Sequence, residues 1–161
     1  MPTVNTTPNI SPGMVVQVVR TTSTGVSTGT TLIPADDTIP QNTEGDEYMT
    51  LAITPRSTTN LLIITANVFG CSSVITHLST ALFQDSTAGA LAATAVYGET
   101  AFGERMIPLI HSMTAGTASS TTFKIRAGGS NAGTFTFNGV NGGRFFGAIT
   151  KSVITIVEVM V

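Results

Sequence analysis

Residues 151–161, KSVITIVEVMV, form the stretch of sequence that decides the fold class. β-Branched side chains occupy most of its positions, and such residues favour the extended backbone of a β-strand. Successive strand side chains point to opposite faces, so Val153 and Val157 share one face while Ile154 and Ile156 share the other. A strand that is apolar on both faces needs a cover on each side. One cover is the domain's own core, and we expect the other to be a neighbouring subunit.

The rest of the composition agrees with an all-β fold. Threonine occurs 29 times and glycine 16 times, whereas charged residues make up only 10% of the chain. Threonine favours strands and glycine favours turns, while lysine and glutamate, the usual material of solvent-facing helices, are scarce. Because 42% of the residues are hydrophobic, the chain is still globular in composition. Such a weakly charged β protein is typical of assemblies that bury surfaces against copies of themselves.

Size and charge limit the number of domains and the kinds of partner. A chain of 161 residues suits one domain with a substantial core. The formal net charge of −2 argues against a nucleic-acid or membrane partner, because both carry negative charge. The N-terminus lacks the basic start and apolar run of a signal peptide, and no apolar stretch is long enough to span a membrane.

Strand-like runs separated by turn residues recur along the chain. They predict a jelly-roll-like β-sandwich over residues 14–161, preceded by a short extended arm at 1–13 that is rich in proline. Besides the last run, the candidate strands are Met14–Arg20, Tyr48–Thr54, Leu61–Phe69, Ser79–Gln84, Ala92–Tyr97, Met106–Met113, Ser120–Ala127 and Thr134–Phe137. The segment Ala88–Ala95 is compatible with either a helical turn or a strand.

One motif resembles that of a hydrolase. Gly25–Gly29 fits G-x-S-x-G around Ser27, and Asp36, Asp37 and His77 follow in the order of hydrolase triads. A nucleophile elbow requires a helix after the serine, but the Thr-Thr-Leu-Ile-Pro that follows cannot begin one. We therefore interpret the motif as a flexible loop between strands, and predict that the chain is not an enzyme and has no catalytic residues.

Five of the nine acidic residues lie within Asp36–Glu47. Carboxylates gathered about a glycine could hold a Ca²⁺ ion, although the spacing does not match that of an EF-hand. The alternative, which we favour, is a solvated acidic connection or one that pairs with Arg56 or Arg105. We accordingly predict no metal and no cofactor.

The two histidines and the one cysteine are isolated in the sequence. His77 and His111 have no ligand-like neighbours, so we expect hydrogen-bonded or packed strand residues. Cys71 has no basic neighbour to activate it and is expected to be buried and inert. The glycine-rich stretches 128–133 and 141–143 lack a phosphate-loop pattern and predict turns in which glycine and asparagine supply positive φ.

Several stretches resemble a domain of virion structural proteins from tailed bacteriophages. The resemblance covers roughly residues 15–160, and its motifs are structural rather than catalytic. The matching stretches are DDTIPQNTEGDEYM (36–49), LAITP (51–55), ALFQDS (81–86), MTAGT (113–117), TFKIR (122–126), GGRFFG (142–147) and SVITI (152–156).

The resemblance implies a homotrimeric jelly-roll protein of the virion. Such domains stand alone as capsid decoration (cement) proteins or form heads at the tips of tail fibres. Only a short arm precedes the first strand here, which favours decoration, with the major capsid protein as partner. The alternative is a tail-fibre or receptor-binding head whose partners are tail components and a host surface receptor.

Overall fold

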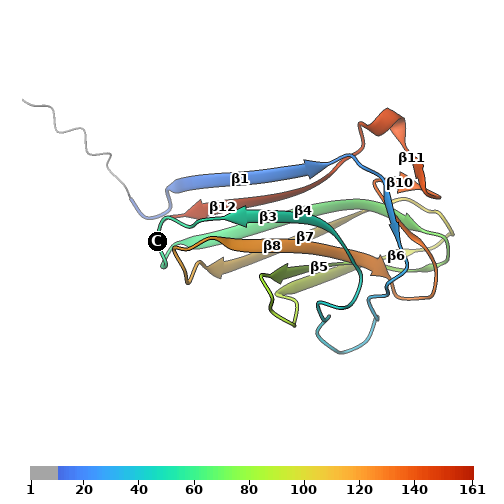
Figure 1. The fold of residues 1–161 in the computed structure, drawn as a ribbon, viewed down its shortest axis with the longest axis horizontal. Helices are drawn as coiled ribbons and strands as arrows, with labels where there is room; N and C mark the ends of the chain where they lie inside the picture. Colours follow the sequence, from blue (N-terminus) through green and yellow to red (C-terminus); the bar gives the residue numbers. More distant parts are fainter. Residues whose placement is uncertain (1–10) are drawn as a thin grey trace, which may run out of the picture.

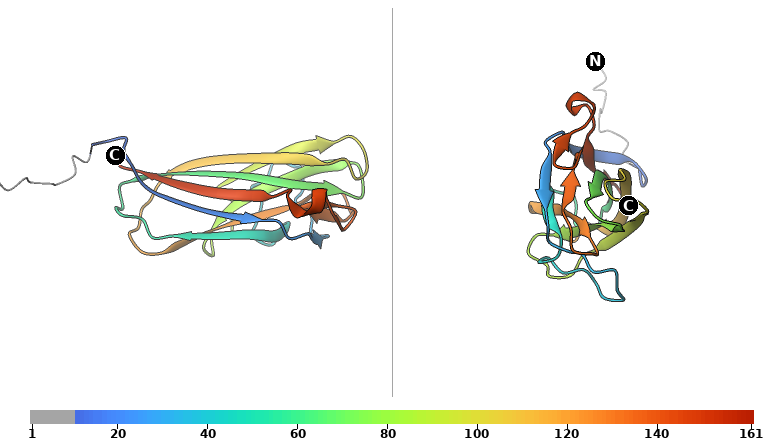
Figure 2. Two further views of the ribbon diagram at one scale, coloured as in Figure 1. Left: turned by 90° about the horizontal axis from the view of Figure 1, so that it is seen from above. Right: turned by 90° about the vertical axis from the view of Figure 1, so that its right-hand side faces the viewer.

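Two antiparallel sheets packed face to face form an elongated β-sandwich (Figures 1 and 2). This arrangement comes from a computed structural model that describes residues 11–161. The chain alternates between the sheets as a jelly roll does, so strands distant in sequence become neighbours. The predicted fold class is confirmed. Within residues 11–161, no helix is long and apolar enough to cross a membrane.

The first sheet contains the last strand of the chain in its middle. From one edge to the other, its long strands run β1, β12, β4, β7, and the short strands β9 and β2 extend the β12 and β1 positions at one end. Their bounds are β1 (Val15–Ser23), β2 (Ser27–Gly29), β4 (Leu61–Ser72), β7 (Arg105–Thr114), β9 (Phe135–Phe137) and β12 (Ser152–Val159).

The second sheet has four strands in the order β3, β8, β5, β6. A small hairpin, β10–β11, and a single turn of 3₁₀ helix, η1, connect β9 to β12 along the chain. The bounds are β3 (Asp46–Ile53), β5 (Thr76–Gln84), β6 (Ala92–Gly98), β8 (Thr121–Gly129), β10 (Gly139–Val140), β11 (Gly143–Arg144) and η1 (Phe146–Ala148).

Every predicted strand is present, usually one to three residues longer than its pattern indicated. Two features differ. The predicted Thr/Ser/Gly loop contains β2, because Ser27–Gly29 pairs with β9. The ambiguous segment Ala88–Ala95 contains no helix: its second half opens β6, which pairs with β5. Ala92, Ala93 and Ala95 lie opposite Leu82, Ala81 and Ser79 of β5 in the antiparallel register.

The core lies between the sheets and is filled by alternate strand residues. On β12 the even-numbered Ile154 and Ile156 are fully buried, as the alternation predicted. Most of the large core side chains come from β4, β5, β8, β9 and β12. A second, smaller cluster of Ile33, Ala81 and Phe83 lies on the outer side of the second sheet. The segment before β3 therefore covers that sheet's outer face.

Glycines serve two different purposes in the glycine-rich stretches. Asn141 and Gly142 have φ of 50° and 72° and form the two-residue turn of the β10–β11 hairpin, as predicted. For residues 128–133 the prediction of positive φ is wrong, because no residue there adopts it. Gly128 is instead required by close approach: a Cβ at this position would lie 2.6 Å from the Thr31 carbonyl oxygen.

Replacing Gly128 with alanine should destabilise the fold by about 1–3 kcal/mol, because the methyl group would collide with backbone that covers the second sheet. Urea unfolding measures the loss. Gly89→Ala is the matched control, since the nearest atom to its new Cβ would be 3.4 Å away and belongs to the Ile39 side chain. Equal stabilities for the two variants would contradict the close packing.

The start of the described chain is tied to its end. The Gly13 amide donates to the Met160 carbonyl at 2.7 Å, and the Met160 amide donates to the Met14 carbonyl at 2.9 Å. Residues 1–10 of the predicted arm lie outside the described residues.

Candidate assembly interface

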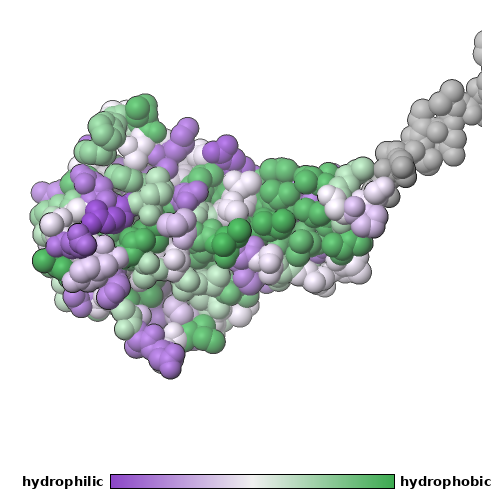
Figure 3. Space-filling view, turned by 180° about the vertical axis from the view of Figure 1, so that it is seen from behind, coloured by the Kyte–Doolittle hydropathy of each residue, from purple (hydrophilic) through white to green (hydrophobic). Residues whose placement is uncertain are grey.

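The outer face of the first sheet carries a group of exposed and half-buried apolar side chains. Figure 3 views the molecule from behind, and apolar side chains gather there on the narrow half nearest the chain termini. They come from β1, β12, β4 and β7. In each of these strands, successive side chains point alternately to the core and to this outer face.

Strand register aligns these side chains in rows across the sheet. In one row Val18 lies beside Val157, which lies beside Ile63, with Ser112 opposite on β7. The neighbouring rows continue the pattern with Val15, Val159, Leu61 and Thr114 on one side and Arg20, Thr155, Thr65 and Ile110 on the other. Neighbours at this spacing form a continuous surface rather than scattered contacts.

Exposure and charge distinguish this face from an ordinary sheet surface. Ile110 is 72% exposed and Val18 is 57% exposed, although both are large aliphatic side chains. Among the aligned residues of these rows the one charged group is Arg20, at the edge of the sheet. An apolar face with so little charge is typical of an interaction surface.

A shallow hollow of about 550 Å³ crosses this face between β4 and β7. It is lined by Leu61, Ile63, Ile110, His111 and Ser112. His111 alternates toward the inner side of β7, beside the buried Ile64, and its side chain is half-buried. A hollow with mainly aliphatic walls suits a protruding apolar side chain from a partner.

A buried carboxylate secures the end of the face near the termini. Glu158 is fully buried, and its Oε1 accepts hydrogen bonds from the Arg56 amide and the Asn60 side-chain amide, both at 2.7 Å, and from the Ser57 amide at 3.4 Å. Its Oε2 has no hydrogen-bond partner within residues 11–161. Glu158 thus orders the connection between β3 and β4 beneath the neighbouring strands.

Glu158 was not predicted to be a buried residue, although the alternation of β12 places position 158 on the same face as positions 154 and 156. Positions 154 and 156 were predicted to face one side together, and position 158 continues that set. When those two isoleucines face the core, the carboxylate must face it too. A buried charge of this kind needs several donors, and the β3–β4 connection supplies them.

The hydrolase-like motif does not form a nucleophile elbow. Ser27 begins β2, an edge strand, and is exposed. Asp36 accepts hydrogen bonds from the amide and hydroxyl of Thr38, so the Asp36 carboxylate is engaged in a local turn. His77 is exposed on β5, where its ring packs against Tyr97 with 5.0 Å between ring centroids. These residues serve separate local structures.

The acidic stretch Asp36–Glu47 is engaged with protein groups other than those predicted. Glu47 lies 3.8 Å from Lys124 and 3.7 Å from Arg126, so the expected pairing with Arg56 or Arg105 is wrong. Asp46 accepts from the amide and the hydroxyl of Thr31. Glu47 meets Lys124 and Arg126 because its strand, β3, pairs with β8, which carries both basic residues. Within residues 11–161 no group of three His, Cys, Asp or Glu side chains is placed to hold a metal ion.

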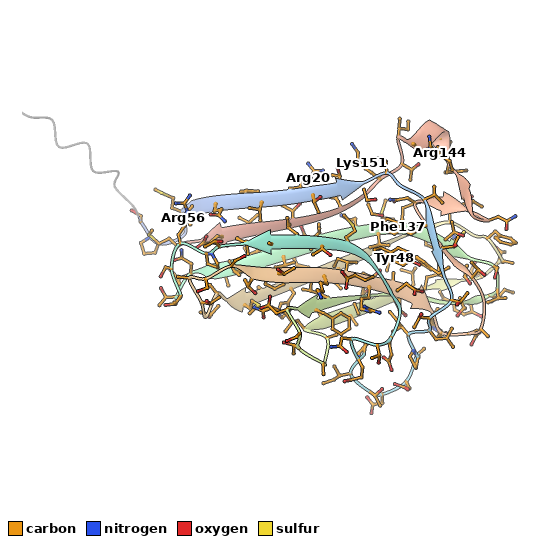
Figure 4. The ribbon with its side chains drawn as sticks, viewed as in Figure 1. Arg20, Tyr48, Arg56, Phe137, Arg144 and Lys151 are labelled. Atoms are coloured by element: carbon orange, nitrogen blue, oxygen red, sulfur yellow. The ribbon has the colours of Figure 1, made fainter. Side chains whose placement is uncertain are left out.

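The prediction for Cys71 is confirmed in one respect: the thiol is fully buried. Burial raises the pKa of Cys71 above its usual value, which keeps the thiol protonated and weakly nucleophilic. Tyr48, stacked on Phe137 inside the sandwich (Figure 4), also has a raised pKa because of burial and the nearby Asp46 carboxylate. Both groups stay neutral at physiological pH.

Two antiparallel sheets packed as a jelly roll, one of them with a mostly apolar outer face, define a β-sandwich protein. A family model described as the Pgp3 C-terminal domain matches residues 27–161. The chain therefore belongs to the Pgp3 C-terminal domain family.

Solved structures similar to this chain share its fold at low sequence identity. An Eiger TNF structure from S. frugiperda is 10% identical, with a TM-score of 0.51 over 88% of this chain and 92% of that one. A carbohydrate-binding module, CBM36, in complex with calcium and xylotriose is 13% identical, with a TM-score of 0.43 over 86% of this chain and 98% of that one. The infectious bursal disease virus Gx strain structure is 15% identical, with a TM-score of 0.42 over 100% of this chain and 42% of that one.

The TNF likeness supports the jelly-roll fold alone, and the two weaker likenesses carry no argument. No curated protein sequence matches the chain. The family and the fold together indicate a structural or virulence protein.

Proposed function

We propose that this protein is a structural protein that assembles as a homotrimer through the outer face of its first sheet. The observation that carries the proposal is the aligned apolar rows of β1, β12, β4 and β7, with one charged residue at their edge. Burying this face removes apolar surface from water, which stabilises association by about 25 cal/mol per Å² before the costs of binding.

A threefold arrangement closes the assembly and buries the same face on every subunit. An open chain of contacts would leave an uncovered apolar face at each end. The low charge of the face favours a copy of the same chain as partner, since an apolar surface needs an equally apolar counterpart. Sedimentation-equilibrium analysis of the full chain tests the proposal. A trimer is the expected result, and a stable monomer at micromolar concentration would overturn it.

We place this trimer in a virion, as a decoration protein that binds the major capsid protein and braces the head shell. The alternative is a head domain at the tip of a tail fibre that contacts the host surface. Copy number per virion separates the two: decoration requires hundreds of copies, on the order expected for a shell lattice, and a tail tip requires few.

We also propose that Ser27 has no hydrolytic role. The expected result is that Ser27→Ala leaves any esterase or glycosidase activity of the preparation unchanged, because Ser27 lies on an edge strand and His77 packs against Tyr97 instead. Hydrolysis of a chromogenic ester or glycoside measures it. Activity that disappears in Ser27→Ala and persists in Thr28→Ala would contradict the proposal.

A further inference from the structure

The connection between β11 and β12 projects from the sandwich. We call residues 143–151 the tip loop. Figure 1 shows it rising above the end of β1, and Figure 2 shows it standing clear of both sheets when the molecule is viewed from its end. It exposes two large apolar side chains, Phe146 at 68% and Ile149 at 77%.

The backbone of the tip loop holds these side chains outward. Phe146, Gly147 and Ala148 have consecutive φ values of 45°, 63° and 70°, a left-handed turn that non-glycine residues rarely adopt. The turn is anchored by Phe145, whose ring centroid lies 4.0 Å from that of Phe146 and 6.0 Å from that of Phe69 on β4. A strained turn that presents rather than buries a phenylalanine indicates an interaction site.

Basic residues flank this apolar loop. Figure 4 shows Arg20, Lys151 and Arg144 along the same upper edge of the molecule, and all three are exposed. They are three of the seven basic residues of the chain. Eight of the nine acidic residues lie between positions 36 and 104, and the ninth, Glu158, is buried. The tip loop itself carries Arg144 and Lys151 and no acidic residue, so its own charge is positive although the net charge of the chain is −2.

We propose that the tip loop docks onto an anionic lipid bilayer. Phe146 and Ile149 enter the headgroup region, while Arg144 and Lys151 pair with lipid phosphates. A projecting apolar tip with cations at its base has the amphipathic character of interfacial membrane anchors. A polyanion without an apolar layer would give the Ile149 side chain no favourable contact. The proposal does not depend on the trimer or on placement in a virion.

The absence of tryptophan from the chain gives the test a clean probe. Phe146→Trp introduces one indole at the tip, and its fluorescence should shift to the blue when phosphatidylglycerol-containing vesicles are added. Pure phosphatidylcholine vesicles should give little shift. The matched control is Ile39→Trp, because Ile39 is a large apolar residue that is 63% exposed on the segment covering the second sheet. That variant should show no shift.

Vesicle co-sedimentation of the otherwise unaltered chain measures binding itself. Phe146→Ser with Ile149→Ser should weaken binding to phosphatidylglycerol-containing vesicles by at least about tenfold, because both apolar contacts are lost. Arg144→Gln with Lys151→Gln should weaken it by about 30-fold. Binding that survives both double variants, or no binding by the natural chain, would overturn the proposal. A changed oligomeric state in the serine variant would show a subunit contact and overturn it as well.

Discussion

Replacing Ile110 with arginine is expected to convert the proposed homotrimer to monomers. Ile110 is 72% exposed on the outer face of β7, so the single chain should tolerate the change with little loss of stability. In the assembly the guanidinium would be buried on an apolar face without an acidic partner. An unpaired buried charge costs about 3 kcal/mol or more in each copy, which weakens association by over about 100-fold.

Sedimentation velocity of the natural chain and the variant at equal concentration measures this effect. Ile39→Arg is the matched control, since it introduces the same charge at another exposed isoleucine away from the first sheet. That variant should remain trimeric. If Ile110→Arg also remains trimeric, the outer face of the first sheet is not the subunit interface, although the protein still self-associates.

The second large effect concerns the buried carboxylate of Glu158. Glu158→Ala should lower the free energy of unfolding by about 3 kcal/mol, because it leaves the Arg56 amide and the Asn60 side chain without their acceptor and opens a cavity. Urea unfolding at one fixed protein concentration measures the loss, since the stability of an oligomer depends on concentration.

Two further variants separate the causes of that loss. Glu158→Gln keeps an Oε1 acceptor for the same donors and should cost about 1 kcal/mol. Glu47→Ala removes an acid whose contacts with Lys124 and Arg126 are 3.7–3.8 Å and partly exposed, so it should cost less than about 0.5 kcal/mol. A loss in Glu158→Ala no greater than in Glu47→Ala would show that the β3–β4 connection does not rely on this carboxylate.

Local sequence patterns predicted the strands and which side chains of a strand share a face. Ile154 and Ile156 share one face of β12 and Val153 and Val157 share the other, as the alternation required, and the structure shows that the isoleucines face the core. The same pattern, continued by two residues, places Glu158 inside. These features are accessible because backbone preference and the period of two depend on adjacent residues alone.

Side-chain contacts between strands that are distant in the sequence could not be predicted from local patterns. The acidic stretch was expected either to be solvated or to pair with Arg56 or Arg105, yet Glu47 faces Lys124 and Arg126 because β3 pairs with β8. Strand order follows from how the whole chain winds between two sheets. That winding depends on the burial of all strands together, and no local pattern contains it.

The residue pattern alone establishes an all-β protein whose last strand needs a cover on both faces. The fold was needed to show that β1, β4 and β7 extend that strand's outer valines into one apolar face. It also decided that Arg20 lies near Arg144 and Lys151 on one edge of the molecule (Figure 4). The physical reason is that side-chain alternation is a property of neighbouring residues, whereas surfaces are formed by residues that hydrogen bonding between distant strands brings together.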